Sequence, residues 1–458
     1  MCTRTGTYHP CKEASYTVNV QAIVALSILI VTFVLILTEF LHSTVAALVG
    51  AALTIIAMKV FGLGFDVLYE RGGTGAITFH TIIETIGLLL GMMIIVGILS
   101  KTGFFQWTAL KSYEFAKGEP WKLMLMLIIT TACLSAFLDN VTTVLLMVPA
   151  TIELASVLKI NPIPMLISEA LASNIGGTAT VIGDPPNIMI GSAFHLSFVS
   201  FIINVAPIIV INMIVFILLI RIFYREKLGE TTELEEIENL KRKYAIKDME
   251  LFKRSLFIFM FVILLFIIHE FIGISLAESA LIGAVLLLLL SGEEIHEALE
   301  SVEWPTLLFF AALFVIIAGA VEMGLIDVIA DETTNLIGGN PVLAIILIVW
   351  VAAFTSSIIG AIPSTATMIP IVSALSLSLG DLESIGGVTT LYWALSLGAC
   401  LGGNGTPIGT AASVVMLGYS ERTKHAISYR EFMKTSIPIT IITLVLSTMY
   451  LLMRYVMF

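Results

Sequence analysis

Apolar segments long enough to cross a lipid bilayer follow one another from residue 20 to the end of the chain, beginning with Val20–Thr38. A bilayer core about 30 Å thick needs about 20 apolar residues per helix. Only 12% of the residues are charged, against the ~25% of soluble domains, which is too little charge to coat a soluble surface. We therefore predict an all-α polytopic membrane protein, and we exclude soluble enzymes, secreted modules and disordered chains.

The second half of the chain repeats the first. Ser135 and Met147-Val148-Pro149 recur at the same spacing as Ser356 and Met368-Ile369-Pro370, and Gly176-Gly177 recurs as Gly402-Gly403. Such self-similarity indicates two copies of one structural unit. The predicted organisation is an N-terminal tail (1–19), a first repeat (20–224), a charged linker (225–254) and a second repeat (255–458).

Both repeats follow the same order of segments: three spans, a pair of apolar arms joined by a short turn, a Gly-rich interrupted segment and a closing span. In the first repeat these are Val20–Thr38, Thr44–Phe61, Ile86–Leu99, Leu123–Phe137, Val141–Leu158, Ile163–Ile190 and Phe198–Phe223. In the second repeat they are Leu256–Ile272, Leu276–Ser291, Thr306–Val321, Val342–Ile359, Ile362–Leu377, Leu391–Leu417 and Thr435–Met453.

The paired arms favour re-entrant hairpins. An arm of about 16 residues spans about 24 Å at 1.5 Å per residue, which is short of the 30 Å core. Each repeat then has five transmembrane helices, and the odd number inverts the second repeat. We expect two inverted repeats of five transmembrane helices, each with a re-entrant hairpin and a broken helix. If the arms crossed fully instead, the chain would have up to fourteen spans.

The distribution of charge sets the expected orientation. Placing the linker in the cytoplasm puts most of the 23 Lys and Arg residues on the inner side. This agrees with the rule that cytoplasmic loops of membrane proteins carry an excess of Lys and Arg. The outer stretch Glu322–Asn340 then holds acids and no Lys or Arg. This predicts an integral multi-pass cell membrane protein with a cytoplasmic linker and both termini outside.

The first pair of arms meets at Asp139 and Asn140, within Ser135–Thr143 (SAFLDNVTT). A charge at membrane depth costs several kcal/mol unless it is paired, hydrated or bound to an ion. Together with Thr142 and Thr143, these residues offer hard oxygen ligands for a small cation. The alternative is a turn at the membrane surface with an exposed Asp.

The interrupted segments form the second candidate feature. Ser173–Asn187 (SNIGGTATVIGDPPN) is loosened by glycines and stopped by Pro185-Pro186, and Gly402–Ser413 repeats the break. Two broken helices in matching positions indicate the central site of a transporter. Asp184 is either a proton-carrying group or a structural cap, and Glu153 and Glu169 also lie deep. The candidate ion or substrate ligands here are Ser173, Asn174, Gly176, Gly177, Thr178, Thr180, Asp184, Asn187, Gly402, Gly403, Asn404, Thr406, Thr410 and Ser413.

These motifs resemble the ion-transporter superfamily, in particular the P-protein and arsenite-pump membrane-protein branch with its citrate-transporter-like domain. SAFLDNVTT, SNIGGTATVIGDPPN and Tyr392–Gly409 (YWALSLGACLGGNGTPIG) carry the resemblance, and Gly87–Leu99 adds to it. It implies an elevator-type transporter with a cation or substrate site between the hairpin tips and the broken helices. Members of the superfamily carry arsenite, carboxylates, sodium against protons, or chloride.

The second repeat departs from this pattern. Gly360-Ala361 stands where the family has Asp-Asn, and Thr410–Ser413 replaces Ala-Ser-Ala-Asn. We therefore expect one main coupling site in the first half, where Na⁺ could bind at Asp139, Asn140 and Asn174. The second half is expected to contribute an asymmetric substrate site of Ser364, Thr365, Asn404 and Thr406.

The predicted function is secondary active transport of a small anion, an oxyanion or a carboxylate, coupled to H⁺ or Na⁺, and not an enzymatic reaction. Arsenite or antimonite and organic anions are equal candidates for the substrate. The substrate class therefore includes neutral oxyacids as well as anions. Since no P-loop is present, ATP could act only through a separate ATPase subunit. We expect a homodimer in lipid, with no cofactor and no nucleic acid. The alternatives are a Na⁺/H⁺ antiporter, a passive anion channel, and an intramembrane protease using Asp139 and Asp184.

Overall fold

The computed structural model describes residues 20–38, 40–65, 78–117, 119–224, 244–292, 295–378, 389–423 and 425–457, and every regular element in these ranges is a helix. The predicted N-terminal tail (1–19) and residues 225–243 of the predicted linker lie outside the described residues.

The first repeat contains ten helices that the structure describes. They are α1 (Val20–Leu37), α2 (Ser43–Phe61), α3 (Phe79–Lys101), α4 (Phe104–Ala116), α5 (Pro120–Ser135), α6 (Asn140–Val157), α7 (Ile163–Gly177), α8 (Pro185–Phe194), α9 (Phe198–Asn204) and α10 (Ala206–Tyr224). The second repeat contains α12 (Met249–Ile272), α13 (Leu276–Ser291), α14 (Ile295–Glu300), α15 (Trp304–Glu322), α16 (Leu325–Ile337), α17 (Pro341–Ile359), α18 (Ala361–Ser378), α19 (Thr389–Gly403), α20 (Ala411–Glu421) and α21 (Tyr429–Leu452), followed by a π-helical turn, Met453–Met457.

The helix boundaries reproduce the repeat found in the sequence. The offset that places Ser135 on Ser356 also places α4 on α16 and α6 on α18, each time with the same first and last position. The offset that places Gly176 on Gly402 does the same for α7 and α19. Within the described ranges, nine helices are long and apolar enough to cross a membrane, or ten if α8 and α9, bent by 113°, count as one span. The chain is an all-α polytopic membrane protein built from two repeats.

Several boundaries differ from the predicted ones. The predicted closing span Phe198–Phe223 is divided into α9 and α10, and α12 begins at Met249, inside the range predicted for the linker. The helices α4 and α16 were not predicted, because their polar residues made these segments too hydrophilic for a span. Each follows a glycine with positive φ, 85° at Gly103 and 75° at Gly324, a conformation that glycine adopts without steric cost and that turns the chain.

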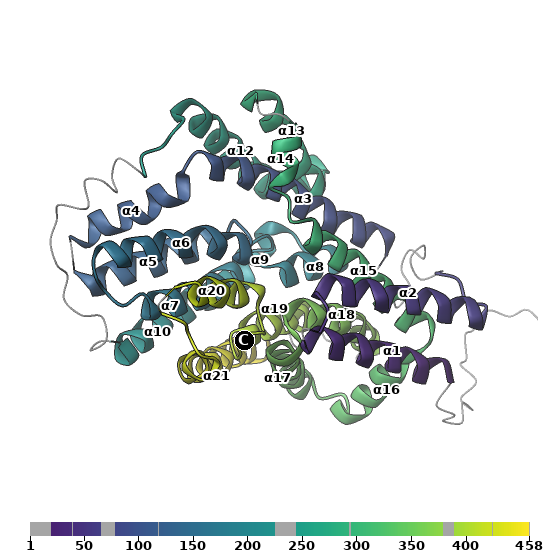
Figure 1. Ribbon diagram of the computed structural model, residues 1–458. Coiled ribbons are helices and arrows are strands. Elements are labelled where there is room, and N and C mark those ends of the chain that lie inside the picture. The colour runs from purple at the N-terminus through teal and green to yellow at the C-terminus, as the bar shows by residue number, and fades with distance from the viewer. Residues whose placement is uncertain are drawn as a thin grey trace, which may run out of the picture.

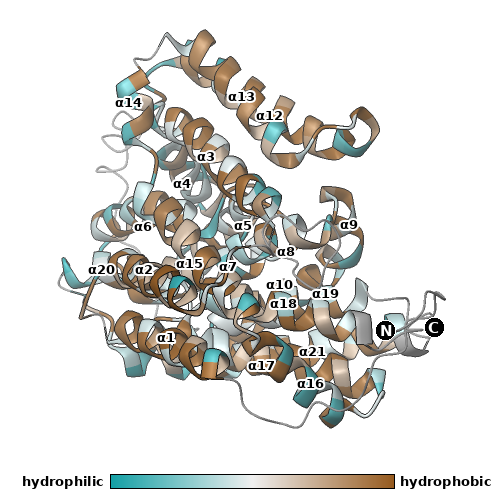
Figure 2. Ribbon diagram, turned by 90° about the vertical axis from the view of Figure 1, so that its right-hand side faces the viewer, coloured by the Kyte–Doolittle hydropathy of each residue, from teal (hydrophilic) through white to brown (hydrophobic). Residues whose placement is uncertain are grey.

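The two repeats exchange partners in the outer part of the molecule. The second span of each repeat packs against the third span of the other, α2 on α15 and α13 on α3. Figure 1 shows α12 and α13 above α3, and α1 and α2 towards α15 and α16. We call α1–α3, α12, α13 and α15 the scaffold. It presents apolar residues outward, such as Phe271, which is 91% exposed, and Figure 2 shows these outer helices as mostly hydrophobic, as a lipid-facing surface requires.

The hairpins and broken helices form a second group, α5–α8 and α17–α20, which we call the hairpin unit. Within it each hairpin packs on the broken helix of its own repeat, α5 on α7 and α17 on α19. Glycines allow this approach: a Cβ on Gly176 would lie 2.4 Å from the carbonyl oxygen of Ala132, and one on Gly402 would lie 2.3 Å from the Cα of Ala353. Small residues at such contacts are typical of membrane helices that pack closely.

Candidate functional site

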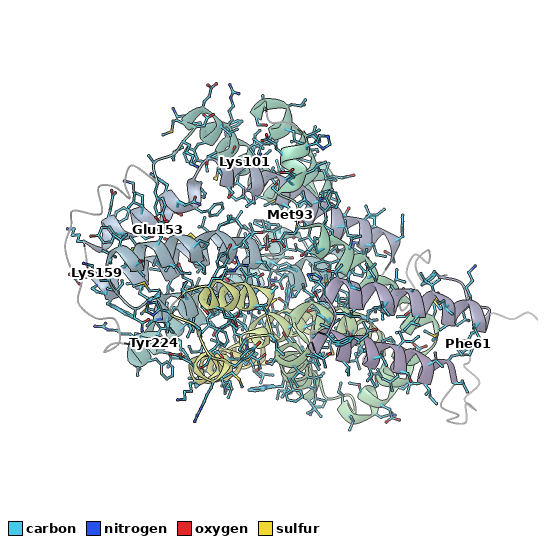
Figure 3. All side chains as sticks on the ribbon, in the orientation of Figure 1. Phe61, Met93, Lys101, Glu153, Lys159 and Tyr224 are labelled. Carbon is cyan, nitrogen blue, oxygen red and sulfur yellow. The ribbon has the colours of Figure 1, made fainter. Side chains whose placement is uncertain are left out.

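A cavity of about 680 Å³ lies where the scaffold meets the hairpin unit. Both hairpin tips border it, as do the starts of α8 and α20 at the two helix breaks. Scaffold residues form the opposite wall, including Leu89, Phe309 and Met93, which is labelled near the centre of Figure 3. The cavity therefore joins the two sequence features, hairpin tips and helix breaks, that were predicted to meet.

Asp139 starts α6 at the tip of the first hairpin. Its carboxylate accepts hydrogen bonds from the amide of Thr142, at 2.9 Å, and from the Thr142 hydroxyl, at 2.5 Å. The Thr143 hydroxyl donates to the Asp139 carbonyl at 2.9 Å. This is an N-cap, which satisfies amides that the first turn of a helix leaves free. It also holds the carboxylate of Asp139 beside the cavity.

Asn140 ties the hairpin tip to the first broken helix. Its side-chain amide donates to Asn174 Oδ1 at 3.0 Å and to Asp184 Oδ1 at 3.1 Å. Asn174 in turn donates to the carbonyl of Cys400 at 2.6 Å, so the bonds continue into the second repeat. The second carboxylate oxygen of Asp184, which is 1% exposed, has no hydrogen-bond partner. An unpartnered buried carboxylate oxygen is the kind of group that a proton or cation satisfies.

The break between α7 and α8 is held open by side chains that bond its backbone. Asn187 donates to the carbonyls of Thr178 and Thr180, at 3.0 and 2.9 Å, and accepts from the Ser396 hydroxyl at 2.6 Å. The Thr180 hydroxyl donates to the carbonyl of Ala136 in the hairpin. Unwound backbone inside a membrane needs such partners, so these polar residues build the break.

The second break repeats this construction. The Thr406 hydroxyl donates to the Ser357 carbonyl at 2.5 Å, matching the Thr180 bond one repeat earlier. Thr410 caps α20 through the amide of Ser413 at 3.2 Å. Asn404 reaches the Leu171 carbonyl of the other repeat at 3.4 Å, and its Oδ1 has no partner.

The tip of the second hairpin has a different backbone and not only different side chains. Gly360, which occupies the position of Asp139, has φ 92° and ψ 153°, a combination that is essentially restricted to glycine. The Ala361 amide donates to the Gly409 carbonyl at 3.0 Å, which closes the tip onto the break. The Ser364 hydroxyl pairs with Thr355 at 2.6 Å, and Thr365 donates to the Ala361 carbonyl. This tip therefore presents an apolar wall to the cavity.

The cavity is acidic. Asp139, Asp184 and Glu303 line it, and among its lining residues there is no Lys or Arg. The first residues of α6, α8, α18 and α20 also border it, and the start of a helix carries a partial positive charge. Glu303, which precedes α15, was not predicted, because an acid at the start of a span resembles an interfacial residue. Burial, and secondarily the charge of Asp139, raise the pKa of Glu303 to about 7, while its hydrogen bond from Thr306 lowers it.

The predicted site residues separate into two groups. Four of them line the cavity: Asp139, Asn140, Asp184 and Thr410. The others lie behind it, in the bonds that shape the tips and breaks or in their close packing: Thr142, Thr143, Ser173, Asn174, Gly176, Gly177, Thr178, Thr180, Asn187, Ser364, Thr365, Gly402, Gly403, Asn404, Thr406 and Ser413. The structure brings Asn174 Oδ1 and Asp184 Oδ1 together at the side-chain amide of Asn140, while the carboxylate of Asp139 is bonded to Thr142.

The profile of the citrate transporter family matches residues 33–398. The chain is 38% identical to an uncharacterised transporter of Mycobacterium tuberculosis over 435 residues, 95% of this chain and 99% of that protein. It is 35% identical to the human P protein over 520 residues, covering 96% of this chain and 61% of the P protein.

Two solved transporters share the fold. The structure of MtrF from Neisseria gonorrhoeae, described as illuminating a class of antimetabolite efflux pumps, has a TM-score of 0.56 at 15% identity and covers 94% of this chain and 95% of its own. The YdaH transporter of Alcanivorax borkumensis has a TM-score of 0.54 at 15% identity, covering 81% and 85%. The family match and the 38%-identical transporter confirm the predicted resemblance and remove the protease alternative. The chain belongs to the citrate transporter family, and it is a membrane transporter of the anion or carboxylate class and not an enzyme.

Proposed function

We propose that the protein is a secondary active transporter that moves a small carboxylate or oxyanion by elevator-type alternating access coupled to H⁺ or Na⁺. The cavity carries this proposal, because it lies between the scaffold and the hairpin unit and is bordered by both hairpin tips and both helix breaks. A substrate bound there would travel with the hairpin unit. The scaffold wall is mainly apolar, with Leu89, Met93 and Phe309, so few polar bonds would resist sliding.

The charges in the cavity support coupling to a cation. Three carboxylates without a Lys or Arg would repel an anionic substrate. A proton or Na⁺ bound near Asp139 and Asp184 would remove that repulsion, and the four helix starts would then attract the anion. Binding of the cation and binding of the anion would strengthen each other by the same factor, as thermodynamic linkage requires.

The size of the cavity supports a polyatomic substrate. Sites for small molecules measure about 300–1,000 Å³, and about 680 Å³ is far more than a bare Na⁺ needs, which disfavours a pure Na⁺/H⁺ antiporter. Organic anions and arsenite or antimonite remain the two candidate classes. The charge distribution supports a cytoplasmic linker with both termini outside. In that orientation His42 and Glu303, which line the cavity, would lie towards the cytoplasmic side. The proposed partners are a second copy of the chain, forming a homodimer, and a separate ATPase subunit.

Transport by the purified protein in proteoliposomes tests the proposal. Citrate, arsenite, sulfate and chloride uptake are measured under imposed H⁺ and Na⁺ gradients, in the wild type and in Asp139→Asn. We expect accumulation of one carboxylate or oxyanion that depends on one cation gradient and is lost in the variant. Unchanged gradient-dependent uptake in Asp139→Asn contradicts the coupling role of Asp139. Single-channel currents whose flux rises linearly with the gradient would instead identify a passive channel.

A further inference from the structure

Glu169 is a buried carboxylate outside the cavity. It lies in α7, is 0% exposed, and accepts a hydrogen bond from the Thr151 hydroxyl of α6 at 2.9 Å. The Thr131 hydroxyl of α5 also lies beside its carboxyl group. Apart from each other, neither Glu169 Oε2 nor Thr131 Oγ1 has a hydrogen-bond partner. A buried carboxylate in such a position is costly when it is ionised, so a reason for its presence is needed.

The second repeat shows that the fold does not require this group. The two offsets that relate the repeats place three apolar residues, Ala352, Val372 and Leu395, at the positions of Thr131, Thr151 and Glu169. All three apolar counterparts are 0% exposed, and α17, α18 and α19 pack around them as α5, α6 and α7 pack around the polar set. The same architecture is therefore filled by apolar side chains in one repeat and carries a carboxyl group in the other.

A proton fits the site better than a metal ion. One carboxylate and two hydroxyls are too few for Na⁺ or Ca²⁺, since hard cations take about six or more oxygens. A proton on Glu169 gives its carboxyl group a donor, and the neighbouring Thr131 hydroxyl has a free acceptor. One proton thus satisfies both unpartnered groups and removes the buried charge.

No cation in the described part of the structure neutralises Glu169. The helices packed against α7 include α5, α6, α10, α19 and α20. The cations on or beside these helices have other contacts: Lys122 pairs with Glu119, Arg221 stacks on Trp121, and Arg422 stacks on Tyr419. Other titratable groups also contact residues other than Glu169: Glu153 accepts from Tyr244, Tyr224 bonds Thr435, Tyr392 stacks on Phe194, and Cys400 bonds Asn187. Cys133 and Glu421 are exposed. In Figure 3 Glu153 and Tyr224 lie towards one end of the bundle, away from Met93 at the cavity.

Small and polar residues lie between Glu169 and the break that follows α7. Glu169, Ser173 and Gly177 follow one another at every fourth position of α7 and so share one face. On α5, Ser135 lies one helical turn after Thr131, its hydroxyl has no partner, and a Cβ on Gly177 would lie 3.1 Å from it. The break that follows ends at Asp184, whose second oxygen is also unpartnered.

We propose that Glu169, with Thr131 and Thr151, carries the coupling proton of the transport cycle at a site separate from the substrate cavity. The step is the binding of one proton to the ionised carboxylate, with no other bond changed, and its release when the hairpin unit has moved. This inference rests on the proposed function, because it adds a residue that binds a coupling proton to the cation site proposed near Asp139 and Asp184.

Two variants test the site. Glu169→Gln keeps the shape and the hydrogen bond from Thr151 but cannot exchange a proton. The triple variant Thr131→Ala, Thr151→Val, Glu169→Leu gives the first repeat the packing that the second already has. The matched control is Glu153→Gln, because Glu153 is a glutamate of the same region that is bonded to Tyr244.

The experiment uses the full chain in proteoliposomes with whichever radiolabelled substrate of the panel the wild type moves. We expect both variants to lose uptake driven by a proton gradient by about 10-fold or more, a coupling of ordinary size, while counterflow of labelled against unlabelled substrate persists. Glu153→Gln should keep both activities. In infrared spectra the carbonyl band of a protonated carboxyl group should be present in the wild type and lost in Glu169→Gln.

Proton-driven uptake that survives in both variants would overturn the proposal, and so would an infrared band unchanged in Glu169→Gln. Loss of counterflow together with uptake in both variants would show a structural role and would also overturn it. Failure of the proposed function has a different signature. The wild type would then move no substrate of the panel by uptake or counterflow, while the infrared band would still report the protonation of Glu169.

Discussion

The bond pattern of Asn140 leads to a quantitative prediction for Asn140→Ala. Asn140 is 4% exposed, and its amide is the donor to two buried acceptors, Asn174 Oδ1 at 3.0 Å and Asp184 Oδ1 at 3.1 Å. A lost hydrogen bond costs about 0.5–1.5 kcal/mol between neutral groups and about 1.5–3 kcal/mol at a charged group. The sum is a loss of about 2–4.5 kcal/mol in the free energy of unfolding.

The assay is reversible unfolding in mixed micelles, followed by tryptophan fluorescence, with Thr143→Val as the control. Thr143 is on the same turn, but its hydroxyl bonds only the Asp139 carbonyl of its own helix, so we expect a loss of no more than about 1 kcal/mol. Combining Asn140→Ala with Asn174→Ala should cost less than the sum of the single changes, because both remove the same bond. If Asn140→Ala costs no more than Thr143→Val, its amide does not hold the hairpin tip to the broken helix.

Three further variants test the geometry around the cavity. Gly360→Asp places a side chain at φ 92° and should lower stability by about 1–3 kcal/mol; an unchanged unfolding midpoint would contradict the glycine-only backbone. Gly176→Ala should destabilise by a similar ~1–3 kcal/mol through overpacking against α5, whereas Gly418→Ala, with nothing within 4 Å, should be neutral or stabilising in thermal unfolding. Because the pKa of Glu303 is raised from 4.5 to about 7, the stability that neutral Glu303 contributes is present below pH 4.5 and is lost as the pH rises through 7. Glu303→Gln should flatten that decline, and parallel stability–pH curves for the two proteins would refute it.

Much of the architecture was predictable because it depends on local properties. Segment length and hydropathy placed α1, α2, α13 and α15 within a few residues, and the repeat related the two halves. The polar tip at Asp139 and Asn140 was recognised because a charge between two apolar arms is costly unless it has a role. The helices α4 and α16 were missed because neither is apolar enough for a span.

The site was only partly predictable. Sequence indicated Asp139, Asn140, Asp184 and Thr410 at the cavity, but it could not separate residues that face the cavity from those, such as Asn187, that bond the backbone behind it. That distinction depends on where a side chain points and what surrounds it.

By itself, the sequence determined the membrane environment, the internal repeat and the positions of the polar groups along the chain. Lipid allows few backbone structures, and a charge at membrane depth is costly unless it is paired, hydrated or bound to an ion. The tertiary structure decided which of those groups meet. It brought Glu303 to the cavity from the other repeat and gave Gly360 a backbone that Asp139 does not share. It also showed that Glu169 occupies a space that the second repeat fills with leucine. These outcomes depend on contacts between residues far apart in the chain, which no local pattern encodes.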